Sequence, residues 1–134
     1  MIQRRTLLAG LAVVTTAGTA RATTARAATQ APFDAAAFAA AQAAGKPILV
    51  AVHADWCPVC AKQKPILSKL EAEPAMAALV VFMVDFDTQK DVTQRLGVQK
   101  QSTLIVFRGA AERDRSTGVT DEAAIKALLA KAVA

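Results

Sequence analysis

The feature that most constrains how this chain can fold is a pair of cysteines placed shortly after an apolar run. Residues 48–54 read ILVAVHA, a pattern typical of a strand buried on both faces of a sheet. Residues 56–73 are predicted to form a helix that has Cys57 at its start and Cys60 one turn later. Pro58 suits the first turn of that helix. The sequence therefore predicts a buried strand that leads into a helix opened by a C-x-x-C pair.

The rest of the chain alternates between helix and strand patterns. Pro65 should kink the cysteine-bearing helix about two turns in, because proline has no backbone N–H and clashes with the preceding turn. Residues 28–32 are expected to be a loose leader. Beyond these segments, the patterns predict helices over 33–44 and 90–96, strands over 78–86, 103–107 and 112–117, and a last helix capped by Thr120 or Asp121. The order αβαβαββα indicates an α/β fold with a central mixed sheet flanked by helices and a hairpin at one sheet edge.

The first 27 residues have the pattern of a secretory signal peptide. Arg4 and Arg5 precede a largely apolar run over residues 7–20, and the small-x-small sequence Ala-Arg-Ala ends at residue 27. The run has about 14 residues, fewer than the ~20 of a membrane-spanning helix. We therefore expect cleavage after export rather than an uncleaved anchor, with no stable membrane insertion afterwards. Residues 28–134 then form one mature domain.

The two adjacent arginines, followed by Thr6, Leu7 and Leu8, resemble a twin-arginine export signal. An ordinary secretory signal that happens to contain two arginines is the alternative. Both routes lead out of the cytoplasm, so we expect a periplasmic protein.

The net charge belongs mainly to this leader. The whole chain has 16 lysines and arginines against 11 acidic residues, a net charge of +5. Residues 1–27 hold four arginines and no acidic residue, so 12 basic and 11 acidic residues remain without them, or +1. A nucleic-acid-binding surface needs a clustered basic face. The sequence therefore argues against nucleic acid as a partner.

Cys57 and Cys60 are the only cysteines, and a disulfide across so short a loop adds little stability. The pair is better suited to opening and closing than to a structural role. Unpaired backbone N–H groups at a helix start favour a thiolate, so we expect Cys57 to be exposed, to have the lower pKa and to be the nucleophile. Cys60, more buried, would resolve the mixed disulfide. An inert disulfide and a shared zinc site are the alternatives, although zinc normally needs four ligands.

The chain resembles the thioredoxin family over residues 33–134. The similarity lies in Ala-Asp-Trp-Cys-Pro-Val-Cys at residues 54–60, in Pro65 five residues after the second cysteine, and in the segments 84–87, 97–98 and 103–107. The resemblance implies a thioredoxin fold, a redox-active disulfide between the two cysteines, and thiol–disulfide exchange as the activity.

Two positions depart from the family pattern. Thioredoxins carry a buried Asp six residues before the first cysteine, where this chain has Ala51. The family also carries a cis-proline just before Thr103, where this chain has Ser102. A non-proline cis bond costs ~3 kcal/mol, so we expect a trans bond at Ser102. This loop helps to hold a substrate's backbone beside the sulfurs, so the change should affect substrate binding and rate more than the fold.

His53 is the only histidine, and its side chain should share a strand face with Ala51. One hypothesis is that it takes over part of the missing Asp's proton handling. Another is that it joins the cysteines in binding Cu(I), a soft ion suited to thiolates. The simplest interpretation is a core histidine with one satisfied hydrogen bond. Trp56 is expected to be a surface or half-buried platform beside the cysteines, and Asp55 a solvated carboxylate.

Together these features predict an exported thiol–disulfide oxidoreductase that needs no cofactor. Pro58 and Val59 between the cysteines include no histidine to stabilise a thiolate, which favours a reductase over an oxidase. The expected partners are cysteine-containing exported proteins and a membrane electron donor that recharges the pair. The alternatives are a periplasmic copper-binding module that uses Cys57, Cys60 and His53, and a redox-silent interaction domain with the same fold.

Overall fold

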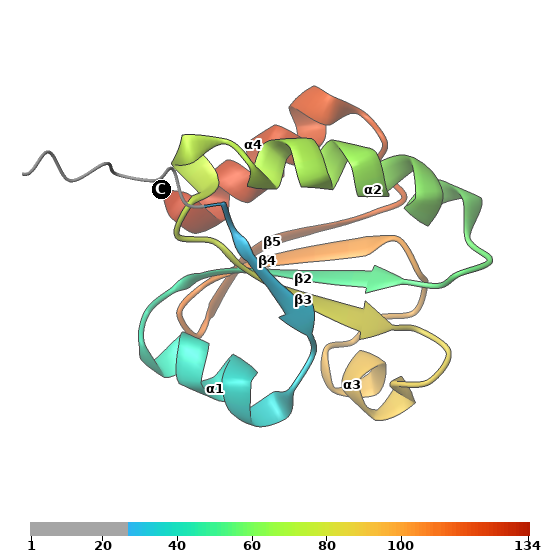
Figure 1. Ribbon diagram of the computed structural model, residues 1–134. Helices are drawn as coiled ribbons and strands as arrows, with labels where there is room; N and C mark the ends of the chain where they lie inside the picture. Colours follow the sequence, from blue (N-terminus) through green and yellow to red (C-terminus); the bar gives the residue numbers. More distant parts are fainter. Residues whose placement is uncertain (1–26) are drawn as a thin grey trace, which may run out of the picture.

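The computed structural model describes residues 27–134, which form one five-stranded sheet with helices on both faces (Figure 1). The predicted signal peptide lies outside the described residues except for its last position. The elements, in chain order, are β1 (Thr29–Pro32), α1 (Ala35–Ala43), β2 (Pro47–His53), α2 (Pro58–Glu71), the 3₁₀ turn η1 (Pro74–Met76), β3 (Val80–Asp85), α3 (Lys90–Arg95), β4 (Thr103–Arg108), β5 (Ala111–Thr117) and α4 (Glu122–Val133). Every helix and strand predicted from residue 33 onward is present, with bounds within two residues of the predicted ones.

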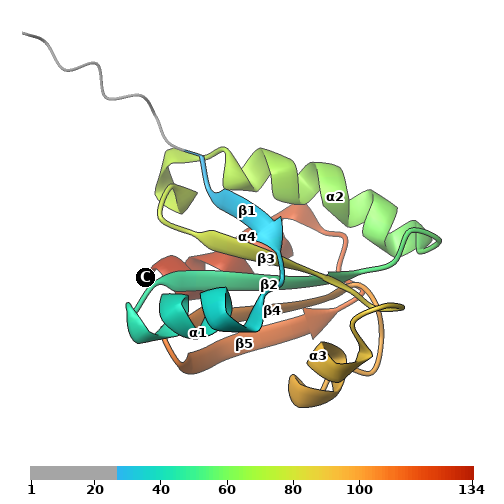
Figure 2. The same ribbon diagram turned by 60° about the horizontal axis from the view of Figure 1, so that its bottom comes forward.

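Strand β1 was not predicted. Residues 28–32 were expected to be a loose leader, but residues 29–32 pair in parallel with residues 80–83 of β3 at the edge of the sheet (Figure 2). The segment TQAP is short and mostly exposed, so it has no apolar pattern to reveal it. Its place in the sheet comes from backbone pairing, and Pro32 is tolerated because it ends an edge strand.

The strand order β1-β3-β2-β4-β5 places β2 at the centre of the sheet. Strand β2 runs parallel to β3 and antiparallel to β4, and β4 and β5 form the predicted hairpin, with the polar β5 at the second edge. The predicted mixed sheet is therefore confirmed. The carboxyl end of β2 leads into the start of α2, where the cysteines lie.

The core has two layers, one on each face of the sheet. Helices α2 and α4 cover one face, and α1 and α3 cover the other (Figure 1). Alternate residues of β2 serve the two layers: Leu49 and Ala51 face α2 and α4, whereas Ile48, Val50 and Val52 face α1 and α3. This alternation confirms that the apolar run before the cysteines is a strand buried on both faces.

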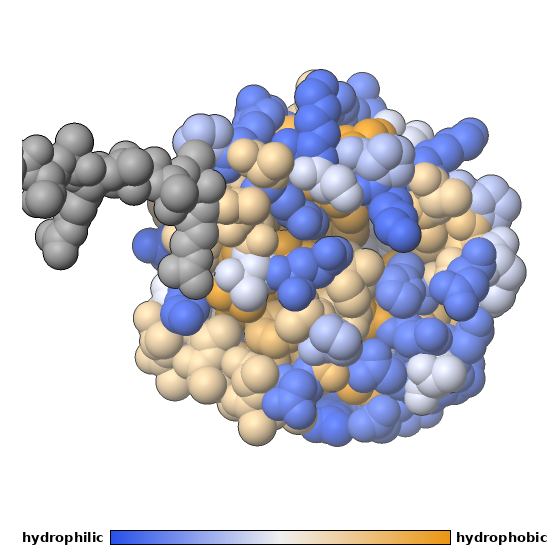
Figure 3. Space-filling view, in the orientation of Figure 1, coloured by the Kyte–Doolittle hydropathy of each residue, from blue (hydrophilic) through white to orange (hydrophobic). Residues whose placement is uncertain are grey.

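The α1 side of the core is aromatic. Four phenylalanine rings pack edge to face or tilted, with centroids 5.2–5.8 Å apart: Phe33, Phe38, Phe82 and Phe107. Outside this cluster, the exposed alanines of α1 form the pale apolar surface at the lower left of Figure 3. Within residues 27–134, none of the helices has the length and hydropathy needed to cross a membrane.

Candidate active site at the start of α2

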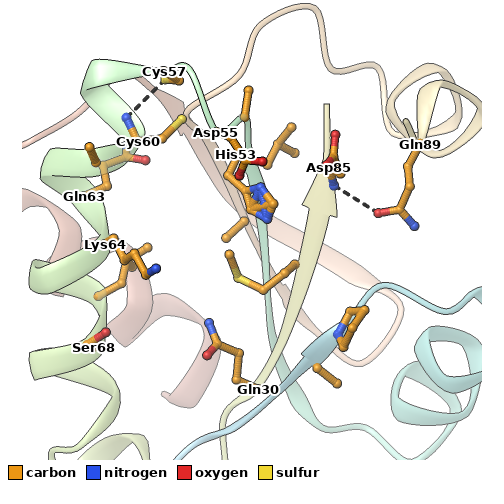
Figure 4. A pocket seen from close by; sticks show the side chains of 18 of the residues that line it. Gln30, His53, Asp55, Cys57, Cys60, Gln63, Lys64, Ser68, Asp85 and Gln89 are labelled. Carbon is orange, nitrogen blue, oxygen red and sulfur yellow. Dashed lines mark hydrogen bonds between the residues drawn. The ribbon is translucent and has the colours of Figure 1, made fainter. Parts of the chain in front are cut away.

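The turn between β2 and α2 places Cys57 at the N-cap of the helix. The Cys57 N–H donates to the Ala54 carbonyl (3.1 Å), and Pro58 begins the helix. The Cys57 Sγ accepts a hydrogen bond from the Cys60 backbone N–H at 3.1 Å (Figure 4). This is the position of an ordinary N-capping oxygen, where an unpaired N–H and the helix dipole both favour negative charge. The predicted position of Cys57 at the start of the helix is therefore confirmed.

Both sulfurs are less accessible than expected. Cys57 is 3% exposed and Cys60 9% exposed, so the prediction of an exposed nucleophile in front of a buried partner was wrong. The two residues pack in a small cluster with Ala54, Val59 and Phe86. The cysteines are free thiols in this structure, and the predicted disulfide between them stays a prediction. Both cysteines line a cavity.

Ser102 contacts both sulfurs directly. Its Oγ lies 3.1 Å from the Sγ atoms of Cys57 and of Cys60, and the side chain is buried. The predicted trans bond is confirmed, because residues 27–134 contain no cis peptide bond. Ser102 instead adopts a left-handed backbone with φ of 63°. The sequence had marked Ser102 as part of a substrate-holding loop, but not as a residue whose hydroxyl meets the sulfurs.

Gln63 fixes the Ser102 loop to the cysteine-bearing helix and was missed in the sequence. Its buried side-chain amide donates to the Ser102 carbonyl at 3.2 Å and to the Val119 carbonyl at 2.8 Å. A glutamine three residues after Cys60 lies on the same helix face, which is the signal that could have revealed it. The hydrogen bonds of the Thr103 hydroxyl are to Lys100 and Thr117 rather than to the sulfurs. Its hydroxyl donates to the Lys100 carbonyl at 2.8 Å and so shapes the loop.

The pKa values of the two thiols are shifted in opposite directions. Burial opposes ionisation of Cys57, but hydrogen bonds from Cys60 and Ser102 outweigh it and lower the pKa of Cys57. Burial, together with the neighbouring Cys57 sulfur, raises the pKa of Cys60. The predicted order, with the lower pKa at Cys57, is therefore confirmed. The arrangement therefore makes Cys57 the thiol that ionises first.

Trp56 lies on the surface beside the cysteines, as predicted. Its side chain is 60% exposed, and its indole Nε1–H donates to Asp87 Oδ2 at 2.7 Å. Asp87 follows β3, and its own backbone N–H donates to Asp85 Oδ1 at 2.8 Å. The indole is therefore fixed by a hydrogen bond at its nitrogen, and most of its remaining surface is exposed to solvent. Asp55, next to it, is exposed.

A cavity of about 710 Å³ extends from the cysteines along the groove between α2 and the β1 side of the sheet (Figure 4). Lys64 and Ser68 of α2 form one wall, and Gln30 of β1, opposite them, lies at its far end. Ala51 contributes only a methyl group to the floor. The position where the family carries its buried Asp is therefore open space in this chain.

His53 lines the same cavity, at the cysteine end of β2. It is half-buried and pairs in register with Asp85 of β3. Hydrogen bonds from the backbone N–H groups of Thr88 and Asp87 lower the pKa of Asp85, and His53 adds a smaller electrostatic contribution. In the described part of the chain, no three His, Cys, Asp or Glu side chains gather closely enough to hold a metal ion. His53 is therefore not placed as a third copper ligand beside the cysteines.

Glu71, at the last turn of α2, is a buried acid that the sequence analysis did not single out. It is 8% exposed and lines the cavity, and its Oε1 has no hydrogen-bond partner. Burial raises the pKa of its carboxyl group above the ordinary value of 4.5. The apolar residues around it on the helix face, Leu67 and Leu70, are the signal that it points inward.

Fold and site together define a class of protein: a thioredoxin-fold protein with a dithiol at the start of the helix that follows its central strand. The thioredoxin family model matches residues 28–131, and the chain belongs to that family. Thioredoxins are thiol–disulfide oxidoreductases.

Individual relatives agree with this assignment. The chain is 36% identical to mitochondrial thioredoxin-2 of Schizosaccharomyces pombe over 88 residues, which cover 66% of this chain and 64% of that protein, just under two thirds of its length. It is 32% identical to thioredoxin of Chlamydia muridarum over 84 residues, 63% of this chain and 80% of that protein. The solved structure of Trxlp from Edwardsiella tarda superposes with a TM-score of 0.74 at 48% identity, covering 75% of this chain and 98% of that one.

Replacing Glu71 with Gln should change how stability depends on pH. Because the folded pKa is raised, the folded chain holds this proton to higher pH than the unfolded chain, so the contribution of Glu71 falls as pH rises above about 4.5. Glu71→Gln should therefore unfold at higher urea concentration than the wild type at pH 8, with the gain disappearing below pH 4.5. Glu122→Gln, which alters an exposed carboxylate, is the control. An equal gain at both pH values would contradict the account.

Proposed function

We propose that this chain is an exported thiol–disulfide oxidoreductase that works mainly as a reductase of cysteine-containing proteins outside the cytoplasm. The observation that carries the proposal is the Cys57 sulfur at the N-cap of α2, with a hydrogen bond from the Cys60 N–H and the Cys60 thiol one turn behind. Family membership supports the exchange chemistry. The sequence of residues 1–27 supports export.

The reaction follows from the order of the two pKa values. The Cys57 thiolate attacks one sulfur of a substrate disulfide, a Cys57–substrate disulfide forms, and the other substrate sulfur leaves as a thiolate that takes a proton from water. Cys60 then loses its proton and attacks the Cys57 sulfur. A Cys57–Cys60 disulfide forms and the second substrate thiolate leaves. The substrate gains two electrons and the chain loses two.

Continued turnover needs a reductant, because each cycle leaves the Cys57–Cys60 disulfide behind. We propose a membrane electron donor that passes two electrons to this pair by the same exchange chemistry. The proposed direction of electron flow, from this pair to the substrate, rests on the residues between the cysteines. Pro58 and Val59 include no histidine to stabilise the thiolate further. The exposed Trp56 beside the cysteines supports a protein substrate, because its indole offers a large contact surface.

His53 is the candidate for moving the proton of Cys60. It lines the cavity that also contains Cys60, and the neighbouring Ala51 side chain leaves that space open. The proposal is that His53 accepts the Cys60 proton as Cys60 attacks, directly or through water in the cavity. Geometry within one cavity supports this role, and the register with Asp85 gives the resulting imidazolium a nearby carboxylate.

The exchange activity can be tested with the full reduced chain and insulin as the substrate. The wild type should accelerate reduction of insulin by dithiothreitol. Cys57→Ser should lose this activity completely, because no nucleophile remains, whereas Cys60→Ser should accumulate a mixed disulfide visible on a non-reducing gel. Lys126→Ala, on the exposed side of α4, is the control. A wild-type rate equal to that of dithiothreitol alone would contradict the proposal.

The role of His53 can be tested by following the rate of the second step against pH. Replacement by Ala or by Gln should slow resolution of the mixed disulfide on the order of a hundredfold, the scale of general acid–base catalysis. Formation of the mixed disulfide, which does not require Cys60 to lose its proton, should keep its rate. A pH profile identical to that of the wild type in both variants would remove His53 from the reaction.

Export can be tested by expressing the full chain in a Gram-negative host and separating periplasm from cytoplasm. The wild type should appear in the periplasm in a shortened form. Replacement of both Arg4 and Arg5 by Lys should leave the full-length chain in the cytoplasm, because the twin-arginine route requires the arginine pair. Export of the double variant would indicate the ordinary secretory route. Full-length wild type confined to the cytoplasm would contradict export altogether.

A further inference from the structure

The hydroxyl of Ser102 has an unusual set of partners. In the described part of the chain, it makes hydrogen bonds only to the two sulfurs, each 3.1 Å from Oγ. The residue is 3% exposed, so water does not compete for these contacts. A hydroxyl that bridges a nucleophilic sulfur and a resolving sulfur is placed to take part in the chemistry of both.

We propose that Ser102 is a catalytic residue whose hydroxyl donates a hydrogen bond to the Cys57 thiolate and accepts one from the Cys60 thiol. The inference rests on the proposed exchange function and adds a third side chain to its reacting centre. It differs from a substrate-holding role, because the hydroxyl acts on the sulfurs of this chain rather than on the backbone of a partner.

The direction of the two hydrogen bonds follows from counting protons. Ser102 has one hydroxyl proton and two lone pairs, so it can donate to only one of the sulfurs. The stronger acceptor is a thiolate, and Cys57 is already the sulfur that accepts the Cys60 backbone N–H. The Cys60 thiol still has its proton and can donate it to a Ser102 lone pair. Each of these protons then has one acceptor. The Cys57 sulfur accepts two hydrogen bonds, one from the Ser102 hydroxyl and one from the Cys60 backbone N–H.

The backbone holds this hydroxyl firmly in place. The Ser102 N–H donates to the Val52 carbonyl at 2.8 Å, and the Ser102 carbonyl accepts from the Gly118 N–H at 3.0 Å as well as from Gln63. These contacts come from β2, from the loop after β5 and from α2. Three separate elements therefore fix the loop that presents the hydroxyl to the cysteines.

The backbone conformation of Ser102 indicates that its side chain has a function at this position. A φ of 63° is in the left-handed region, where glycine fits without strain and other residues are uncommon. Glycine would make every backbone contact that Ser102 makes. What serine adds at this position is its hydroxyl, and the partners of that hydroxyl are the two sulfurs.

The Ser102 hydroxyl also affects the reduction potential of the cysteine pair. A donated hydrogen bond stabilises the thiolate of the reduced pair, whereas the sulfurs of a disulfide are weak acceptors. The Ser102 hydroxyl therefore favours the reduced form and makes the pair a weaker reductant than it would be without the hydroxyl. In the first step the same hydrogen bond increases the fraction of Cys57 that is ready to attack.

The test compares Ser102→Ala with Ser102→Gly in the full chain. Both lack the hydroxyl, and Ser102→Gly also removes the strain of the left-handed backbone, so it should unfold at the same or a higher temperature than the wild type. In both variants the rate of Cys57 alkylation by iodoacetamide at pH 6 should fall roughly tenfold. The equilibrium with glutathione should shift tenfold towards the oxidised pair, a potential about 30 mV more negative.

Ser116→Ala is the matched control, because it removes a hydroxyl from β5, opposite Leu104 in β4, that has no hydrogen bond to either sulfur. It should alkylate and equilibrate like the wild type. Wild-type alkylation and potential in both Ser102 variants would overturn the inference, while insulin reduction by the wild type would leave the proposed function standing. A defect in Ser102→Ala that Ser102→Gly repairs would also overturn it, because the residue would then act through the backbone alone.

Discussion

The hydrogen bond from the Cys60 N–H to the Cys57 sulfur is the interaction on which the site depends. It exists because a strand buried on both faces ends just before α2, so that the first free N–H groups of the helix meet a sulfur instead of a serine or aspartate oxygen. This contact acts together with hydrogen bonds from the Cys60 and Ser102 side chains to lower the pKa of Cys57, whereas burial raises the pKa of Cys60.

Much of the architecture could be predicted because its elements carry their own signals. The apolar runs of β2, β3 and β4 and the C-x-x-C pair before a helix are visible in the sequence without any knowledge of tertiary contacts. Strand β1 could not be found in this way, because four mostly exposed residues are held by backbone pairing with β3. Pairing of this kind depends on a strand about fifty residues away, and no local pattern records it.

The site could be predicted only in part, because some of its contacts join residues far apart in the sequence. The roles predicted for Cys57 and Cys60 follow from their spacing at a helix start, but the hydroxyl 3.1 Å from both sulfurs belongs to Ser102, more than forty residues later. The absence of proline at Ser102 predicted a trans bond, and the structure has one. The left-handed turn that aims the hydroxyl at the sulfurs needs the contacts with Gln63, and these are tertiary.

The chemistry of the site requires the two neighbouring sulfurs to ionise separately, with Cys57 ionising first. The most direct measurement is a pH titration of the reduced full chain by NMR, with ¹³C at the cysteine Cβ atoms and each signal assigned through Cys57→Ser and Cys60→Ser. The account predicts that the Cys57 signal titrates below the ordinary thiol range and the Cys60 signal above it. A single transition shared by both signals at an ordinary thiol pH, or earlier titration of Cys60, would contradict it.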